Sequence, residues 1–517
     1  MDACFGGAWS EDGLTRGEGW CGVAEPAALE RLGDSNLVRT GGYIGGEWVT
    51  TGTAGSFAVA DPATGERLGE LPRMGAAETA DAVDAARAAF EAWRVKPSRE
   101  RAHLLRRWAD LMVEHAEDLA VLLSLEQGKP VPEARGEIVY AGSFLEWFAE
   151  EGRRAYGDVI PSTSADQRIV VIKQPVGVVA GITPWNLPAA MVTRKVAPAL
   201  AAGCCMVLKP AEQTPLMALA ICELGARAGI PAGVFNVVVG DGADAPTIGR
   251  ELTSNPTVRK IGFTGSTEVG KLLMRQAADH VMGLSLELGG NSPFIVFDDA
   301  DVDAAVDGLF QAKFRNAGQL CTGANRVFVQ AGIVDDFVGA LLARVQKMHV
   351  GHGVDPGVDM GPLIDDQGLD KVQRHVADLV DRGSRVLVGG DPGPLGRSFF
   401  EPTVMRGLDP GSLMWQEETF GPVAAIATFG SEAEVIEWSN DTTHGLVTYL
   451  YTKDLGRTWR VSEAIECGMM AINTGRVSGE MAPFGGVKES GLGREGSKYG
   501  LDEWLETKYL NMTGIAP

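Results

Sequence analysis

Residues 176–210 read VGVVAGITPWNLPAAMVTRKVAPALAAGCCMVLKP. A β-branched run, Val176–Ile182, is followed by a bend, by a helix-like apolar segment near residues 188–202, and by a second apolar run, Met206–Leu208. This order is typical of two parallel strands joined by a helix. Similar units follow, so the stretch predicts an α/β fold whose parallel sheet is covered by helices on both faces.

The same alternation extends in both directions and divides into two sets. The first set adds strands at Ile169–Ile172, Val234–Val239 and Lys260–Phe263, with helices near residues 214–229, 243–253 and 266–280. The strands expected in the second set are Phe294–Phe297, Val327–Val329, Arg385–Val388, Val423–Thr428, Val447–Tyr451 and Met469–Asn473. Two parallel sheets are therefore expected, with ligands at the carboxyl ends of strands.

The flanking segments follow other patterns. Residues 43–71 alternate apolar and polar side chains between turn signals, which predicts short strands. Apolar residues recur at helical spacing over Val83–Trp93 and over Leu104–Leu122, which predicts two amphipathic helices. Residues 1–24 are rich in glycine and acidic residues without a period, and we expect a disordered tail there.

Composition restricts the function. The chain has 517 residues, a net charge of −22 and a pI of about 4.8, so nucleic acid and anionic membranes are not expected partners. The number of cysteines is seven, and none form a CxxC pair, which indicates a reducing, cytoplasmic location. Adjacent Cys204 and Cys205 are expected to pack rather than to pair. The histidines form no HExxH motif, so no metal site is expected.

A nucleophile is suggested by Ala312–Arg326, which reads AKFRNAGQLCTGANR. Most single cysteines fill a core, but Cys321 lies among small and amide residues, six positions after Arg315. A nearby cation and exposed backbone N–H groups favour the thiolate, which is the nucleophilic form.

A phosphate-binding loop is suggested after the strand Lys260–Phe263, where the chain reads TGSTEVGKL. Glycine between a strand and a helix lets backbone N–H groups and the helix dipole face a phosphate. The spacing almost fits the triphosphatase motif GxxxxGK[ST], but Leu272 replaces the magnesium-binding hydroxyl. A nucleotide-dependent phosphoryl-transfer enzyme is therefore the weaker alternative.

Several motifs together resemble the aldehyde dehydrogenase superfamily, over nearly the whole chain from about residue 35. They are PWN, KPAEQTP, FTGSTEVG, LELGGNSP, GQLC, EETFGP and PFGGVKESGLGREGSKYG, in this order. Within the superfamily the chain is most similar to succinate-semialdehyde dehydrogenases, through TRKVAPALAAGC and KFRNAGQ.

The resemblance implies the domain organisation. Residues 35–156 and 176–288 would form an NAD-binding domain, and residues 289–498 a catalytic domain. Residues 157–175 and 499–517 would form a β arm for oligomerisation into a homodimer or homotetramer. Residues 1–34 would be a disordered N-terminal extension.

The resemblance also implies the chemistry of NAD(P)-dependent oxidation of succinate semialdehyde to succinate. Cys321 would attack the aldehyde, Asn186 would hold the oxyanion, and Glu287 would activate the water that hydrolyses the thioester. Glutarate semialdehyde or another short aldehyde is the alternative substrate. A family member that is catalytically idle is a third hypothesis, against which the joint presence of these three residues argues.

Cofactor and substrate residues follow from the same motifs. NAD is expected in preference to NADP, because Glu212 can accept hydrogen bonds from both adenosine ribose hydroxyls and would repel a 2′-phosphate. The residues expected to bind the cofactor are Thr183, Pro184, Trp185, Lys209, Glu212, Gly265, Ser266, Glu418 and Phe420. Those expected to bind the substrate carboxylate are Arg194, Arg315 and Ser478.

The chain departs from the superfamily at three positions. Gly323 stands where many relatives have a second cysteine, so a disulfide switch is not expected. Leu187 replaces a common phenylalanine, and Arg476 is an unexpected charge in the substrate loop. Both residues could alter the width of the pocket or its preference for chain length.

Overall fold

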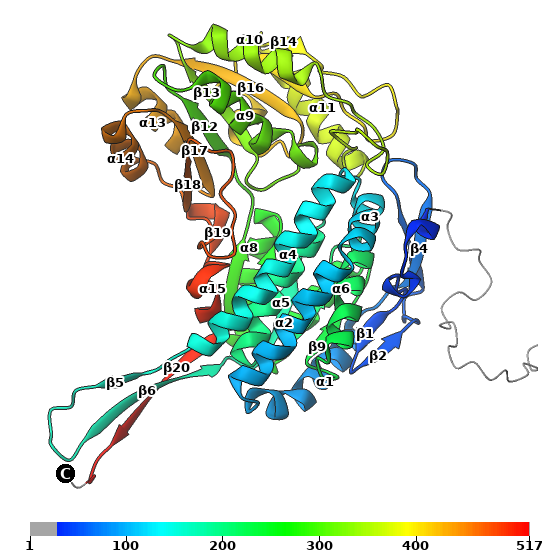
Figure 1. Cartoon of the computed structure of the whole chain (residues 1–517), viewed down its shortest axis with the longest axis vertical. Coiled ribbons are helices and arrows are strands. Elements are labelled where there is room, and N and C mark those ends of the chain that lie inside the picture. Colours follow the sequence, from blue (N-terminus) through cyan, green and yellow to red (C-terminus); the bar gives the residue numbers. More distant parts are fainter. Residues whose placement is uncertain (1–27, 516–517) are drawn as a thin grey trace, which may run out of the picture.

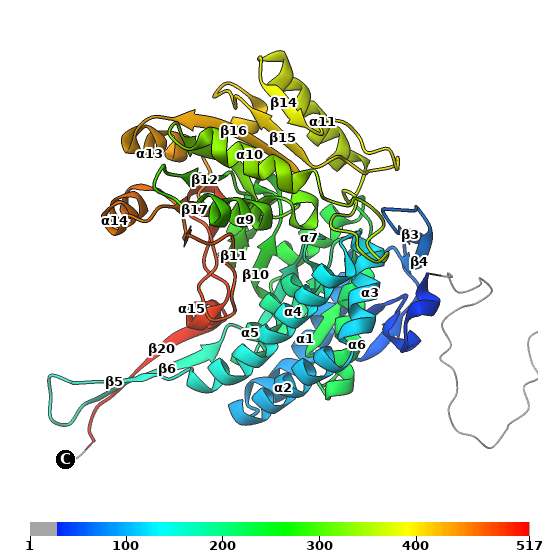
Figure 2. The ribbon, with the colours of Figure 1, turned by 45° about the horizontal axis from the view of Figure 1, so that its top comes forward.

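The computed structural model describes residues 28–515, and the expected tail at residues 1–24 lies outside them. Figure 1 shows two α/β bodies and a β arm that projects from the first body, with the C-terminus at its tip. The second view, in Figure 2, shows the same three parts. The α/β fold expected from the sequence is confirmed.

The first body contains a mixed eight-stranded sheet. Its order is β19 (Gly491–Leu492), β11 (Gly283–Glu287), β10 (Val258–Thr264), β7 (Val178–Ile182), β8 (Cys205–Lys209), β9 (Phe235–Val237), β1 (Gly42–Ile44) and β2 (Glu47–Val49). The five central strands from β11 to β9 run parallel, and the strands at both edges are antiparallel. The strands β7 and β8 are buried throughout or nearly so, as their continuous apolar runs predict.

Two groups of helices cover this sheet. The first group is α2 (Ser98–Glu114), α3 (Ala116–Gln127), α4 (Val131–Glu151), α5 (Pro188–Ala202) and α6 (Pro215–Ala228). The second group is α1 (Ala76–Arg94), α7 (Ala245–Ser254) and α8 (Thr267–Ala277). Members of each group pack on one another, and both α5 and α1 lie against β7 and β8. Helix α5 is wholly buried, which fits its largely apolar sequence, and its two charged residues, Arg194 and Lys195, pair with Glu495.

The second body contains a seven-stranded sheet, parallel except at one edge. Its order is β14 (Arg385–Val388), β15 (Thr403–Arg406), β16 (Val423–Phe429), β13 (Ala324–Gln330), β12 (Ser292–Val296), β17 (Val447–Tyr451) and β18 (Met469–Ile472). Its helices are α9 (Val302–Lys313), α10 (Val334–Val345), α11 (Asp366–Asp381), α12 (Leu413–Gln416), α13 (Glu432–Asn440) and α14 (Leu455–Ala464). One apolar cluster joins the sheet to α9 and α10, and another joins it to α11, α13 and α14.

The arm is a three-stranded antiparallel sheet in the order β20 (Leu505–Met512), β6 (Arg168–Pro175) and β5 (Asp158–Ile160). A separate hairpin joins β3 (Ser56–Ala60) to β4 (Arg67–Pro72). Short 3₁₀ turns occur at Leu29–Arg31, Ser35–Leu37, Gly152–Arg154, Ala278–His280, Arg315–Gly318 and Lys488–Ser490. None of the described helices combines the length and apolar character that a bilayer crossing requires.

Three expectations about the elements are corrected. The helix expected over Leu104–Leu122 is two helices, because His115 leaves helical geometry and ends α2. Residues 28–34, expected within a disordered extension, are folded: Leu29 and Leu32 are buried, and the backbone N–H groups of Gly33 and Asp34 donate to Asp118. Apolar burial and these bonds together hold the segment on α3.

The predicted boundary at residue 498 is also wrong. Strand β19 hydrogen-bonds to β11, so residues 491–492 belong to the first body and not to the second. Helix α15 (Ser497–Asp502) packs against α4 and α5 of that body, and the arm strand begins only at Leu505. Cys204 and Cys205 are buried free thiols, and their expected packing role is confirmed.

Candidate active site

The expected site residues come from two sets of loops that face each other between the two bodies. In the first body, the carboxyl ends of β7, β8 and β11 lead to Asn186, Lys209 and Glu287 respectively. In the second body, Cys321 and Glu418 lie in the segments that precede β13 and β16. The carboxyl ends of strands in the first sheet, where ligands bind such sheets, thus meet loops that precede strands of the second sheet.

Asn186 is tied to the loop that carries Cys321. Its side-chain Nδ2 donates to the backbone oxygen of Gln319 at 3.0 Å, two residues before the thiol. Its own backbone oxygen accepts from Lys129 Nζ at 2.8 Å and from Asn316 Nδ2 at 2.9 Å. Asn186 is buried, so these bonds fix its amide beside the cysteine loop.

The thiol of Cys321 is not activated in the way the sequence suggested. Burial, reinforced by the charge of Glu418, raises its pKa to about 12, although the charge of Arg194 acts in the opposite direction. The guanidinium of Arg315 instead lies near Glu133, and the distance from Arg315 Nε to Glu133 Oε1 is 3.6 Å. The expectation that the local environment favours the thiolate is therefore wrong for the protein without ligands.

Glu287 is a buried carboxylic acid at the end of β11. Burial raises its pKa well above the usual range, and the neighbouring charge of Glu495 reinforces the effect. Its Oε2 has no hydrogen-bond partner among the described residues. An unpaired buried oxygen is costly unless it serves a ligand, so the side chain of Glu287 is available to a bound group.

Several residues expected to bind the cofactor lie at neighbouring strand ends of the first sheet and in the facing loop of the second body. The rings of Trp185 and Phe420 meet edge to face with centroids 5.5 Å apart, which joins the two bodies beside Pro184. The backbone N–H of Thr183 donates to the oxygen of Lys209 at 3.1 Å, so these strand ends lie side by side.

The polar groups at these strand ends suit a dinucleotide. Lys209 Nζ pairs with Glu212 Oε2 at 3.0 Å, which supplies a donor and acceptors for a sugar. Ser266 caps the N-terminus of α8, where backbone N–H groups and the helix dipole attract phosphate. The N–H of the preceding Gly265 donates to the backbone oxygen of Glu287 at 3.0 Å, which links the phosphate loop to the candidate base.

Glu418 is a residue expected to bind the cofactor from the side of the second body. Its Oε1 accepts from the N–H of Gly290 at 3.1 Å, and burial raises its pKa to about 7. Buried Lys313 lies close enough for its charge to interact with Glu418, and burial lowers the lysine pKa to about 7. Glu418 therefore offers a carboxyl group to a bound cofactor.

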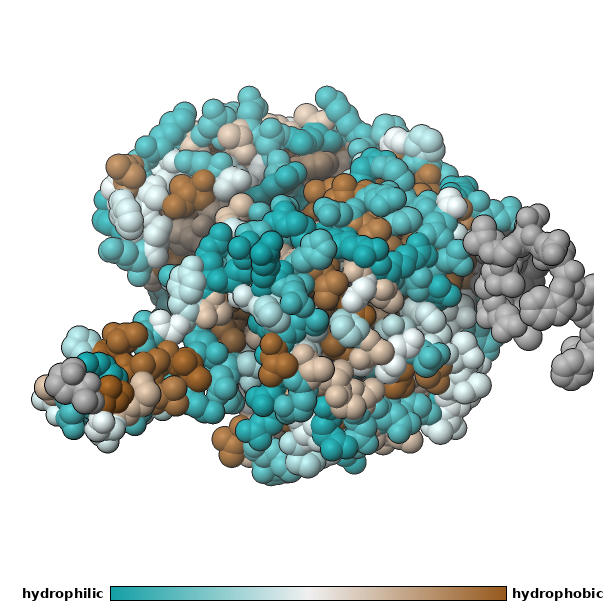
Figure 3. Space-filling view, turned by 60° about the horizontal axis from the view of Figure 1, so that its bottom comes forward, coloured by the Kyte–Doolittle hydropathy of each residue, from teal (hydrophilic) through white to brown (hydrophobic). Residues whose placement is uncertain are grey.

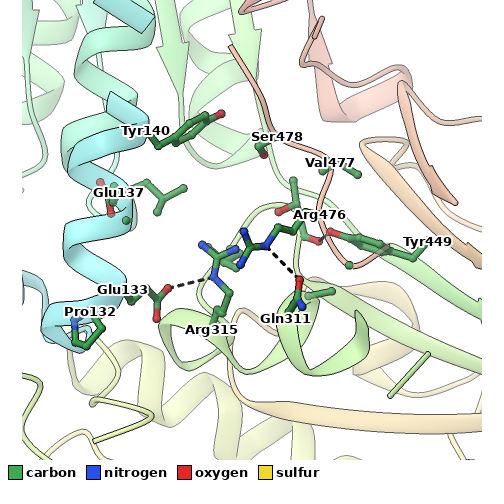
Figure 4. A pocket seen from close by; sticks show the side chains of 16 residues that line it. Pro132, Glu133, Glu137, Tyr140, Gln311, Arg315, Tyr449, Arg476, Val477 and Ser478 are labelled. Carbon is green, nitrogen blue, oxygen red and sulfur yellow. Dashed lines mark hydrogen bonds and ion pairs between the residues drawn. The ribbon is translucent and has the colours of Figure 1, made fainter. Parts of the chain in front are cut away.

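A cavity of about 320 Å³ opens beside Cys321, between α4 and the end of α9. Figure 4 shows it, with Arg315 and Arg476 pointing into it. Leu320 and Thr322, the two neighbours of Cys321 in the sequence, lie in its wall, whereas Cys321 itself does not line it. The full lining is Pro132, Glu133, Gly136, Glu137, Tyr140, Leu187, Gln311, Ala312, Arg315, Leu320, Thr322, Tyr449, Gly475, Arg476, Val477 and Ser478.

The cavity contains two of the three expected substrate residues. Arg315 and Ser478 line it, whereas Arg194 does not. Arg194 is buried on α5, with its Nε 3.1 Å from Glu495 Oε2 and its guanidinium 4.0 Å from the ring centre of Phe484. It acts electrostatically on Cys321 from that position.

Sequence reasoning missed the residues of α4 and the buried Glu495. Glu133, Gly136 and Tyr140 recur at helical spacing and form one wall, a period that the sequence already carried. Glu495 stands inside the C-terminal motif, but only the structure shows that it pairs with Lys195 as well as with Arg194.

Comparisons with known proteins agree with this site. The aldehyde dehydrogenase family matches residues 48–510. The succinate-semialdehyde dehydrogenase [NADP(+)] GabD of Escherichia coli K12 is 56% identical, over 93% of this chain and 99% of that protein. A glutarate-semialdehyde dehydrogenase of Pseudomonas aeruginosa is also 56% identical, over 94% of this chain and 100% of that protein.

A solved structure has the same fold. Betaine aldehyde dehydrogenase from Staphylococcus aureus, in complex with NAD+, superposes with a TM-score of 0.90 at 35% identity, over 95% of this chain and 97% of that one. The family match covers both bodies and the two sets of loops that meet at Cys321. The chain accordingly belongs to the aldehyde dehydrogenase family, as an NAD(P)-dependent oxidoreductase.

Proposed function

We propose that the protein oxidises succinate semialdehyde to succinate with NAD(P). The observation that carries the substrate is the cavity beside Cys321, because its wall presents guanidinium and hydroxyl donors in reach of a short aldehyde. An arginine is the side chain best suited to bind a carboxylate, through parallel charge-assisted bonds. The similarity to the Escherichia coli protein supports the same substrate.

The reaction begins at Cys321. Its thiolate adds to the aldehyde carbon, while the Nδ2 group of Asn186 and the backbone N–H of Cys321 stabilise the oxyanion of the thiohemiacetal. Trp185, Glu212 and Glu418 would hold NAD(P), which when bound would accept the hydride. Loss of hydride from the thiohemiacetal leaves a thioester on Cys321.

Glu287 completes the cycle. Its carboxylate takes a proton from water as the water attacks the thioester carbon, and the carbon–sulfur bond then breaks to release succinate and the thiolate. The raised pKa of Glu287 suits a base that must accept this proton and later return it to solvent. The phosphoryl-transfer alternative is not retained, because the chain belongs to another family and Leu272 cannot bind magnesium.

Glutarate semialdehyde is the second candidate substrate. The Pseudomonas aeruginosa relative named for it is as similar as the Escherichia coli protein, and one methylene separates the two aldehydes. A single methylene changes binding by about 1–3 kcal/mol, which leaves room for both substrates in one pocket.

We also propose a homo-oligomer in the cytoplasm, assembled through the arm. The support is the apolar surface of the arm, where Val159 and Tyr509 are exposed. The cytoplasmic location follows from the low number of cysteines, which is typical of reducing compartments.

The test is a spectrophotometric screen of reduced-cofactor formation with short aldehydes, each with NAD and NADP. Succinate semialdehyde should give the highest kcat/KM, well above butanal, which has the same number of carbons and no carboxylate. Cys321→Ser should abolish turnover while cofactor binding persists, because a serine hydroxyl is a far weaker nucleophile near neutral pH. Turnover by that variant, or a preference of the native enzyme for butanal, would refute the proposal.

A further inference from the structure

The charges on the cavity wall do not contribute equally. The charged residues that line the cavity are Glu133, Glu137, Arg315 and Arg476. Glu137 is already neutralised, because it forms a buried ion pair with Lys129 and accepts the backbone N–H of Ala189 at 2.9 Å. The charge available to a ligand therefore depends on the two arginines and on Glu133.

Arg315 is partly neutralised by Glu133. The distance between Arg315 Nε and Glu133 Oε1 is 3.6 Å, and Figure 4 draws the contact. Glu133 Oε2 accepts the backbone N–H of Asn316 at 3.0 Å, which holds the carboxylate beside Arg315. Within the cavity, the charges of Arg315 and Glu133 cancel to a first approximation.

Arg476 has no such partner. Its Nε donates to the neutral side chain of Gln311, whose Oε1 accepts at 3.1 Å. Over residues 28–515, no carboxylate oxygen lies within 4.0 Å of its guanidinium nitrogens. The full positive charge of Arg476 therefore remains available at the mouth of the cavity, where the side chain is exposed.

Gln311 also explains the placement of Arg476. It stands in α9, and Arg315 follows four residues later in the 3₁₀ turn Arg315–Gly318, just beyond the end of that helix. The hydrogen bond that Gln311 accepts consequently holds the guanidinium of Arg476 near the turn that carries Arg315. Both guanidinium groups point into the cavity (Figure 4).

We propose that Arg476 is the principal residue that recognises the distal carboxylate of the substrate. The inference rests on the proposed function and refines it. Arg476 contributes the uncompensated positive charge, Arg315 adds directed hydrogen bonds, and Arg194 lies outside the cavity on Glu495. The ligand class is an aldehyde with a terminal monoanion, whose single charge matches the net charge of the wall.

The test compares kcat/KM for succinate semialdehyde with kcat/KM for butanal in matched variants. Arg476→Gln should lower this ratio about tenfold, because a charge-assisted hydrogen bond is lost. Arg315→Gln should lower it less, since Glu133 already offsets that charge. Arg87→Gln, a substitution of an exposed arginine on α1, serves as the control and should leave the ratio unchanged.

A second variant separates charge from structure. Glu133→Gln keeps an oxygen for the N–H of Asn316 but removes the carboxylate charge that offsets Arg315. In the double variant that also carries Arg476→Gln, the ratio of kcat/KM for succinate semialdehyde to that for butanal should recover several-fold. The recovery should come mainly from a lower KM for succinate semialdehyde. A misfolded loop would not be rescued by a change on α4.

In the native enzyme, added salt should raise KM for succinate semialdehyde more than in Arg476→Gln, because an exposed charge is screened.

The outcomes are distinct from those that test the reaction itself. If the native enzyme does not prefer succinate semialdehyde to butanal, the proposed function fails. If the native enzyme does prefer succinate semialdehyde, two outcomes would contradict the role of Arg476. One is a ratio in Arg476→Gln within twofold of the native ratio, and the other is a larger fall of the ratio in Arg315→Gln than in Arg476→Gln. A tenfold loss at Arg476 with rescue by Glu133→Gln confirms it.

Discussion

Cys321 occupies the position of a nucleophile but has the acidity of an inactive thiol. Its pKa is raised to about 12 by burial and by nearby carboxylates, chiefly Glu418. The pKa of Glu287 is raised as well. In both groups the reactive form is the deprotonated one, and both shifts favour the protonated form.

This arrangement predicts the reactivity of the thiol without cofactor. Alkylation of Cys321 by iodoacetamide, followed by mass spectrometry of its peptide, should accelerate about tenfold per pH unit between pH 7 and pH 9, since the thiolate fraction rises at that rate below the pKa. We expect no plateau below about pH 10. The buried Cys222 provides an internal control that should not react. A plateau near pH 7 would show that the thiolate is already stabilised at rest.

At the same scale, the sequence predicted which residues meet but not their electrostatic state. The resemblance to a known family named Asn186, Glu287 and Cys321 as one site; Asn186 and Glu287 lie at carboxyl ends of the first sheet, and Cys321 lies in a loop of the second body. The sequence could not reveal that Arg315 turns toward Glu133, because α4 was not predicted and the contact spans 182 positions. Burial, which sets the pKa of Cys321, is likewise a property of the packed fold.

At the scale of elements, we expect the strand end of β8 to influence the choice of cofactor. Lys209 ends this strand and pairs with Glu212 at 3.0 Å, so the carboxylate expected to repel a 2′-phosphate is partly neutralised. This pairing reduces the predicted preference for NAD over NADP, in keeping with an NADP-dependent relative. A modest preference for NAD remains our expectation.

Substitution of the carboxylate should shift that preference. Glu212→Ser removes the negative charge and releases Lys209 to meet a 2′-phosphate, so the ratio of kcat/KM for NADP to that for NAD should rise about tenfold. The control is Glu91→Ser, a substitution on the exposed face of α1. An unchanged ratio in Glu212→Ser would place the adenosine ribose away from this pair.

The elements themselves were predicted where the pattern is strong and local. Strands β7 and β8 follow from nearly continuous apolar runs between turns, and β10 and α5 from the alternation of strand-like and helix-like segments. The break at His115 and the pairing of β19 with β11 were missed because long-range contacts decide them. Residues 28–34 were misjudged for the same reason: their anchors are Asp118 and the core, distant in sequence.

At the scale of the whole molecule, the arm is the feature that the single chain leaves unexplained. It extends from the first body, and Figure 3 shows apolar residues gathered on it. Strands β20 and β5 form its two edges, each with an unpaired row of backbone groups. Exposed edges with apolar side chains invite pairing with another chain, so a free arm is a hazard unless a second subunit covers it.

One pair of matched valines tests this assembly. Val159 in β5 is 77% exposed in the single chain, and Val95 at the end of α1 is 69% exposed. If the arm forms the subunit interface, Val159→Glu buries a charge between subunits and should shift the mass measured by light scattering toward the monomer. Val95→Glu adds the same charge at a similar exposure and should leave the mass unchanged. A native chain that is already monomeric, or equal masses for the two variants, would rule out assembly through this strand. A native oligomer that dissociates only in Val159→Glu would place β5 at the contact between subunits.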